Sequence, residues 1–180
     1  MSFRRIALGW AAAGFVGTLA YASADSFAQG IASHNSRAPV SYEAGRIELF
    51  DRENRVVLSG DVRITQAGLR LNAARTLVTY DDAGGTIRIQ RIVATGSVDV
   101  RRGNERARGD SAIYDFNRRI ITMAGNVRLN RGGDTLNGGR LVIDLNTGVS
   151  SIDGQGAAPT SGASSTTSGG RVTGTFAVPQ

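Results

Sequence analysis

The chain of 180 residues is 41% hydrophobic and 20% charged, which is typical of one globular domain with tails and excludes a fully disordered chain. It holds 24 glycines, 3 prolines and no cysteine, so disulfide bonds are excluded and short strands joined by glycine-bearing turns are favoured. The formal net charge of +6 comes from arginine alone, because the chain has no lysine, and this excludes a phosphate-binding loop that ends in lysine.

The N-terminal segment has the layout of a secretory signal peptide. Two arginines precede an apolar run over residues 6–20, and Ala22-Ser23-Ala24 follows. We expect a signal peptide over residues 1–24, with cleavage after Ala24 or, alternatively, after Ala28. A membrane anchor is the other interpretation, but the run holds three glycines and is shorter than the roughly 20 apolar residues that span a bilayer.

Export of the chain would limit the anionic partners that its arginines can meet. Cleavage of the signal peptide would lower the net charge from +6 to +4. Export argues against nucleic acid as a partner and leaves anionic lipid head groups as candidates for the arginines. A solvated arginine face without a ligand is the alternative.

Residues 25–38 are small and polar without periodicity, so we expect a flexible lead, whose single His34 has no metal-ligand companion. From Pro39 an alternation of apolar and polar residues begins and continues through residues 46–50, until a turn over residues 51–54 ends it. This stretch predicts half of a strand repeat.

One five-residue pattern recurs three times. Each copy has a glycine, a small polar residue and an apolar, polar, apolar alternation, which is typical of a strand with one buried face. The copies are residues 60–64, 96–100 and 125–129, each followed by a turn and a return strand, and residues 150–154 begin a partial copy. Such periods predict an all-β fold of stacked antiparallel hairpins. The repeated glycine fits either a β-bulge or close packing between strands.

Residues 155–180 form a low-complexity C-terminal tail. Residues 157–170 are mostly alanine, serine, threonine and glycine, which predicts flexibility. Residues 171–178 are more strand-like, and they either pair with an exposed sheet edge or are disordered.

Two stretches carry a resemblance to a known family. Residues 57–66, followed by Leu69-Arg70-Leu71-Asn72-Ala73, and residues 109–116, continuing into 121–127, resemble the OstA-like domain of the LptA/OstA-like family of lipopolysaccharide transport proteins. The resemblance covers residues 39–154, and the tail is not part of the shared pattern.

The resemblance implies a partly open, twisted β-jellyroll that encloses an apolar groove for the acyl chains of lipid A. It also implies a periplasmic protein of a Gram-negative cell that contributes to outer membrane assembly. The implied partners are lipopolysaccharide, the inner-membrane ABC transporter complex with its periplasmic OstA-like partner, the outer-membrane translocon, and further copies in a head-to-tail homo-oligomer.

The apolar strand faces allow two interpretations. Periodicity alone favours a filled core, whereas the resemblance implies a lipid groove. Aromatic rings offer large contact areas and methionine adapts to irregular shapes, so these side chains are prominent candidates. The expected lipid-binding residues are Val40, Tyr42, Leu58, Val62, Ile64, Val98, Tyr114, Phe116, Met123, Val127 and Leu129.

The residues give no indication of catalysis. Asp115 and Asp144 lie at equivalent positions of two repeats, which favours a role in turns over an acid–base pair. We therefore expect no enzyme activity, no catalytic residue, no cofactor and no metal.

Two alternatives to a periplasmic lipid carrier stay open. One is another OstA-like module of the same pathway, such as the anchored inner-membrane partner or the N-terminal domain of the outer-membrane protein. The other is a structural β-solenoid that binds no lipid. In a partly open jellyroll we expect the strands near Val40 and Tyr42 and from Leu141 to Leu145 to be edges that another copy could extend.

Overall fold

The computed structural model describes residues 30–154 and 170–176. The predicted signal peptide over residues 1–24, the first part of the predicted lead and most of the tail lie outside the described residues.

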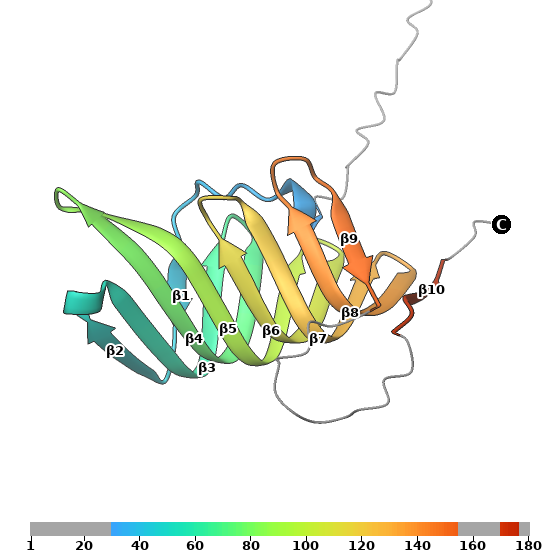
Figure 1. Cartoon of the computed structure of the whole chain (residues 1–180), viewed down its shortest axis with the longest axis horizontal. Coiled ribbons are helices and arrows are strands. Elements are labelled where there is room, and N and C mark those ends of the chain that lie inside the picture. Colours follow the sequence, from blue (N-terminus) through green and yellow to red (C-terminus); the bar gives the residue numbers. More distant parts are fainter. Residues whose placement is uncertain (1–29, 155–169, 177–180) are drawn as a thin grey trace, which may run out of the picture.

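The described chain forms one antiparallel β-sheet, whose strands follow one another along the molecule (Figure 1). The strand order is β1-β3-β4-β5-β6-β7-β8-β10, and in addition β2 pairs with β3 and β9 pairs with β8. Two short 3₁₀ helices, η1 (Ile31–Ser33) and η2 (Asp51–Glu53), accompany the sheet. The all-β prediction is confirmed. The strands are β1 (Ser41–Glu43), β2 (Arg46–Phe50), β3 (Arg55–Gln66), β4 (Leu69–Ala83), β5 (Thr86–Arg102), β6 (Glu105–Asp115), β7 (Ile120–Arg131), β8 (Asp134–Asp144), β9 (Ser150–Asp153) and β10 (Thr173–Thr175).

The glycine of each repeat begins a β-bulge. In β3, β5 and β7 the glycine and the next residue both have positive φ, and at each site the register with the neighbouring strands shifts. Such a bulge bends the strand and increases its twist. Close packing also applies at Gly96, where a Cβ atom would lie 2.7 Å from the Cβ of Ala74. The three pairs have φ of +78° and +47° (Gly60-Asp61), +82° and +50° (Gly96-Ser97), and +78° and +48° (Gly125-Asn126).

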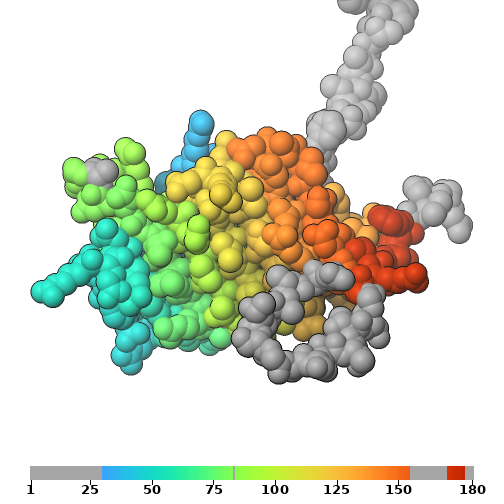
Figure 2. Space-filling model, viewed as in Figure 1, coloured from blue at the N-terminus to red at the C-terminus, as the bar shows by residue number. Residues whose placement is uncertain are grey.

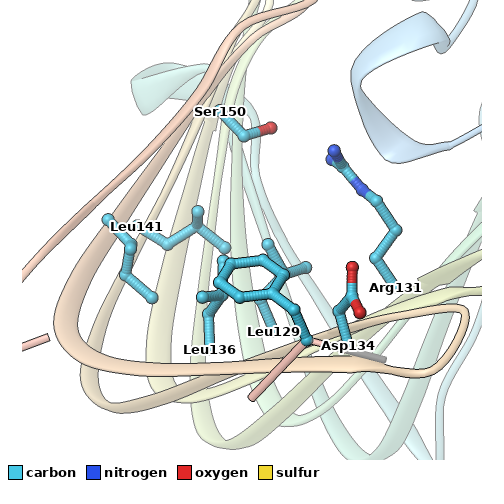
Figure 3. A pocket seen from close by; sticks show the side chains of 8 residues that line it. Leu129, Arg131, Asp134, Leu136, Leu141 and Ser150 are labelled. Atoms are coloured by element: carbon cyan, nitrogen blue, oxygen red, sulfur yellow. The ribbon is translucent and has the colours of Figure 1, made fainter. Parts of the chain in front are cut away.

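The bulges divide each long strand into two halves, and the halves form two walls around an apolar interior (Figures 1 and 3). The buried residues of both walls belong to one cluster. Successive side chains of a strand point to opposite faces, so every second residue of a wall reaches the interior. For example, Val62 and Ile64 point inward and are buried, whereas Arg63 between them is exposed. The first wall comprises residues 62–66, 69–73, 98–102, 105–109, 127–131 and 134–138, and the second comprises 55–59, 75–83, 86–95, 111–115, 120–124 and 140–144.

Short strands cover the two ends of the sheet, which Figure 2 shows in cyan and in orange to red. At one end β3 pairs with β2 along its first half and with β1 along its second half. At the other end β8 pairs with β10 along its first half and with β9 along its second half. These short strands are the edges of the described sheet.

The edges differ in part from the prediction. β1, which holds Tyr42, lies at one end as expected. The segment from Leu141 to Leu145 is not an edge, because Leu141 pairs with Ile152 of β9. For the tail, the edge-pairing interpretation is the correct one at Thr173–Thr175, which pair with Thr135–Asn137 of β8.

Candidate functional site

All eleven residues predicted to line the interior lie on its inner side. Eight belong to the buried cluster, and Val40 and Phe116 pack against it. Tyr42 is 55% exposed and lines a hollow in the interior. The sequence therefore predicts the inner face correctly, while binding of lipid by these residues stays a proposal.

The centre of the interior is filled with side chains. Val62, Val98 and Met123 are at most 1% exposed, and Tyr114 stacks on Phe116 with 4.0 Å between the ring centroids. In this central part the structure has the filled core that periodicity alone favours.

The interior opens into an apolar hollow at the end formed by β1 and β2, which we call the N-terminal hollow. Its volume is about 270 Å³. Three of its large apolar side chains, Tyr42, Leu49 and Ile87, are 55%, 64% and 66% exposed. Single exposed apolar residues are common, whereas these three line one contiguous apolar hollow, which makes it the candidate binding surface of the described residues. The hollow is lined by Val40, Tyr42, Leu49, Val56, Leu58, Ile64, Val78, Tyr80, Ile87, Ile89 and Ile92.

Four residues of this lining, Val40, Tyr42, Leu58 and Ile64, were among those predicted to bind lipid. The prediction missed the others. Their signal is present in the sequence, since Ile87 and Ile89 alternate with arginine and glutamine at the start of β5.

A smaller hollow of about 120 Å³ lies at the other end, which we call the C-terminal hollow. Figure 3 shows Leu129, Leu136 and Leu141 pointing into it, with Arg131 and Asp134 at its rim. Phe176, which follows β10, also lines it. The tail thus contributes a side chain to this end of the interior.

Residues 30–38 cross the interior as an ordered strap, so the prediction of a flexible lead is wrong for these residues. Ile31 is 0% exposed and His34 is 2% exposed. The Nε2 group of Gln66 donates hydrogen bonds to the carbonyl oxygens of Ser36 (3.0 Å) and Ala38 (2.7 Å). The strap is therefore held by a side chain at the end of β3.

The orientation of Gln66 also fixes the tautomer of His34. Because the Gln66 amide nitrogen donates to two carbonyls, its Oε1 is an acceptor, and it lies 2.8 Å from His34 Nε2 and 3.3 Å from the hydroxyl oxygen of Tyr114. The proton of the neutral imidazole is thus on Nε2. His34 Nδ1 is buried and has no hydrogen-bond partner.

The start of the strap is held by charged groups at the β5–β6 turn. Glu105, which is 5% exposed, accepts a hydrogen bond of 2.6 Å from the backbone N–H of Ile31 and forms an ion pair with Arg131. Arg102 donates to the carbonyl oxygen of Gly30 (2.5 Å) and to Ser33 Oγ (2.8 Å). Further along, Arg119 Nε donates to Ser36 Oγ at 2.9 Å. The strap is therefore attached to both walls.

The two rings that contact Gln66, those of His34 and Tyr114, are neutral at neutral pH. Burial lowers the pKa of His34, the hydrogen bond that His34 donates to Gln66 acts against this, and the nearby Arg102 lowers the pKa further. Burial also raises the pKa of Tyr114 to about 12. The network holds the strap in place without a charge on either ring.

Asp115 and Asp144 have the turn roles predicted from their equivalence. Asp115 Oδ1 accepts from the Arg118 N–H (2.9 Å), and Asp144 Oδ1 accepts from the N–H groups of Asn146 (2.7 Å) and Thr147 (3.2 Å). These backbone hydrogen bonds lower the pKa of both carboxyl groups. Each carboxylate closes a turn.

Comparison with known proteins gives the family. Residues 43–149 match the family described as LptA/(LptD N-terminal domain) LPS transport protein. The chain belongs to this family. The expected LptA/OstA-like resemblance is thereby confirmed, and the family is one of transport proteins.

A solved structure has the same type of fold. The chain is similar to LptH of Pseudomonas aeruginosa, the LptA homologous periplasmic component of the lipopolysaccharide transport device, with a TM-score of 0.66 and 18% identity, over 80% of this chain and 99% of LptH. It is also 28% identical over 102 residues to an uncharacterized protein of Rhizobium meliloti (strain 1021), and the match spans 54% of each chain. Within residues 30–154 and 170–176 no helix is long and apolar enough to cross a membrane.

Proposed function

We propose that this chain is a periplasmic lipopolysaccharide-binding protein that shields lipid A acyl chains and bridges the inner-membrane transporter to the outer-membrane translocon, contributing to outer membrane assembly. The observation that carries the proposal is the N-terminal hollow, an apolar surface open to solvent inside a fold of the LPS transport family. An exposed methylene costs about 0.8 kcal/mol, so an acyl chain of about a dozen carbons costs on the order of 10 kcal/mol in water. Such a chain needs a covered path across an aqueous compartment.

The size of the hollow limits how the lipid enters. At about 270 Å³ it is slightly smaller than ordinary pockets for small molecules, which begin at about 300 Å³. We propose that the ends of acyl chains bind first beside Tyr42 and Leu49. Deeper entry toward Tyr114 and Met123 requires the strap to move, because the buried ring of His34 packs against Tyr114, with 6.2 Å between the ring centroids.

Site-specific photo-crosslinking tests the hollow. Tyr42 points into it, whereas its neighbour Glu43 forms an ion pair of 3.0 Å with Arg63, an exposed residue of the outer face. A photo-reactive phenylalanine at position 42 should form an adduct with lipopolysaccharide, and the same group at position 43 should not. Adducts from position 43 alone would overturn the assignment. Tyr42 is a better probe than Tyr114, which is 3% exposed and hydrogen-bonded to Gln66.

Native mass spectrometry of the purified protein separates this function from the alternatives. A mature chain with bound lipopolysaccharide supports the carrier. A chain that keeps residues 1–24 as an anchor supports the inner-membrane module, and a mature chain without lipid after exposure to lipopolysaccharide supports a structural β-solenoid.

We also propose that copies assemble head to tail through the two ends of the sheet. A contact between different surfaces that does not close produces an open filament. β1 and β2 at one end and β9 and β10 at the other would pair edge to edge. Light scattering should show a mass that rises with concentration, and a strict monomer at all concentrations would remove the support for self-assembly.

A further inference from the structure

The outer surface of the first wall carries a concentration of arginines, which we call the arginine face. Its members lie on five consecutive strands, β3 to β7, on the side opposite the buried inner face. They are Arg63, Arg70, Arg101, Arg106, Arg108 and Arg128.

The strand register places like charges directly opposite one another. Arg70 is opposite Arg101, and Arg101 is opposite Arg106 on the next strand. Arg108 is opposite Arg128 in the adjacent row. Like charges at such positions destabilise a sheet, since the Cβ atoms of opposed residues are only about 5 Å apart. The opposed arginines of these two rows repel one another, and a bound anion would reduce this repulsion.

Within β3 to β7 these two rows hold one carboxylate, that of Asp99, and Glu43 of β1 lies opposite Arg63 at the edge. Asp99 accepts from Arg101 (2.6 Å), Arg106 (2.6 Å) and Arg108 (3.2 Å). Although partial burial raises the pKa of Asp99, the three guanidinium hydrogen bonds outweigh burial and lower it. One negative charge thus serves three arginines.

The surrounding carboxylates do not neutralise the excess. Glu43 pairs with Arg63 at the edge. Asp110, at the bend, accepts from Asn126 at 2.9 Å. Several other arginines are matched by a carboxylate, as in Arg46 with Glu48 (2.8 Å). The two rows thus hold six arginines against the carboxylates of Asp99 and Glu43, an excess of four positive charges.

The outer surface of the second wall has a different character. Its middle row is uncharged across six strands and consists of Val57, Leu77, Val93, Ile113, Thr122 and Val142. The rows on either side of it hold Arg55, Arg75, Arg91 and Arg140, but they also hold Asp115, Asp144 and Asp153. The outer surface of the second wall is therefore close to neutral, and an approach driven by charge would orient the protein with the first wall toward the anion.

We propose that the arginine face docks the protein on the surface of an anionic phospholipid bilayer. Five strands about 4.8 Å apart spread the guanidinium groups over about 19 Å. An array of this width can contact several phosphate head groups at once, which favours a membrane surface over a single small ligand. Arginine suits this partner because it is always positively charged, and an anionic membrane surface attracts each Lys or Arg that lies near it. Docking uses the outside of the first wall, so it does not require lipid in the interior.

Vesicle flotation of the purified protein tests the proposal. Vesicles of phosphatidylcholine with phosphatidylglycerol should bind the protein, binding should weaken as salt rises, and pure phosphatidylcholine vesicles should not bind it. The double variant Arg70→Gln/Arg128→Gln should weaken binding roughly 25-fold, at roughly fivefold for each arginine near an anionic surface.

The matched control is Arg75→Gln/Arg140→Gln, which removes the same charge from the outer face of the second wall. It should change binding less than about threefold, because charges beyond a Debye length of about 10 Å are screened. An equal loss in both double variants would show a dependence on net charge alone and would overturn the proposal. Equal binding to both kinds of vesicle would do the same.

Two further arms exclude a discrete phosphate site. Inorganic phosphate, compared with chloride at equal ionic strength, should not displace the protein from vesicles. Arg70→Lys/Arg128→Lys should bind the vesicles nearly as well as the original protein, because a bilayer plane responds to charge rather than to a bidentate geometry. Specific displacement by phosphate, or a loss with lysine as large as with glutamine, would contradict membrane docking.

Discussion

Replacing Gly96 by alanine should destabilise the protein more than the same change at Gly68, although both glycines have a φ of +82°. At Gly68 no atom lies within 4 Å of the added Cβ atom, so the cost is that of a left-handed backbone, about 1–2 kcal/mol. At Gly96 the added Cβ atom lies 2.7 Å from the Cβ of Ala74, which cannot rotate away, and overpacking adds about 1–3 kcal/mol. The expected total at Gly96 is about 2–5 kcal/mol.

Urea unfolding of the two variants measures this difference, provided that the slope m is unchanged. The variant Ala74→Gly/Gly96→Ala should regain the steric part of the loss, and a double-mutant cycle isolates it. Equal unfolding free energies for Gly96→Ala and Gly68→Ala would refute the reasoning, because they would mean that β4 and β5 do not pack closely at the bend.

Three other changes have defined outcomes. As pH falls from about 7.5 to 5.5 the free energy of unfolding should fall, because the pKa of His34 is lowered in the folded state and the unfolded chain binds the proton first. Urea unfolding at several pH values measures this dependence, and the variant His34→Gln should lose it. Met123→Ala should cost about 2–5 kcal/mol in chemical unfolding, since Met123 is 0% exposed, and a cost under about 1 kcal/mol would argue against a filled centre. Gly174→Val should release β10 from β8, because a Cβ atom at position 174 lies 2.6 Å from Leu136 Cδ2. Amide exchange at residues 135–137, which pair with β10, should accelerate. The control variant Thr173→Val should leave this exchange unchanged.

The strand repeats could be predicted because their signal is local. In each copy the inward valine, Val62, Val98 or Val127, is at most 2% exposed, as alternation requires. The bend could not be predicted with the same certainty, because its consequence appears on the neighbouring strand. In β4 the alternation is interrupted, because Ala74 alone faces the two bulge residues Gly60 and Asp61. As a result Ala73 and Thr76, three positions apart, are both buried.

The strap could not be predicted, because its order depends on distant residues. Residues 30–38 have no periodicity of their own, and their partners Gln66 and Glu105 follow about 30 and 70 positions later. Similarly, parity assigns a side chain to the inner face but does not fix the distance to the opposite wall. The interior is therefore both a filled core at Met123 and an open hollow at Tyr42, a combination that alternation alone does not distinguish.

The placement of one bulge in every second strand has a consequence for the length of the interior. Each hairpin brings its own bend, so the curvature belongs to the repeated unit rather than to the sheet as a whole. Duplication or deletion of one hairpin would lengthen or shorten the interior by about 10 Å, which is twice the spacing between strands. The register of the remaining strands would not change. Duplication of the DNA that encodes one hairpin could therefore change the length of the interior in fixed steps of one hairpin.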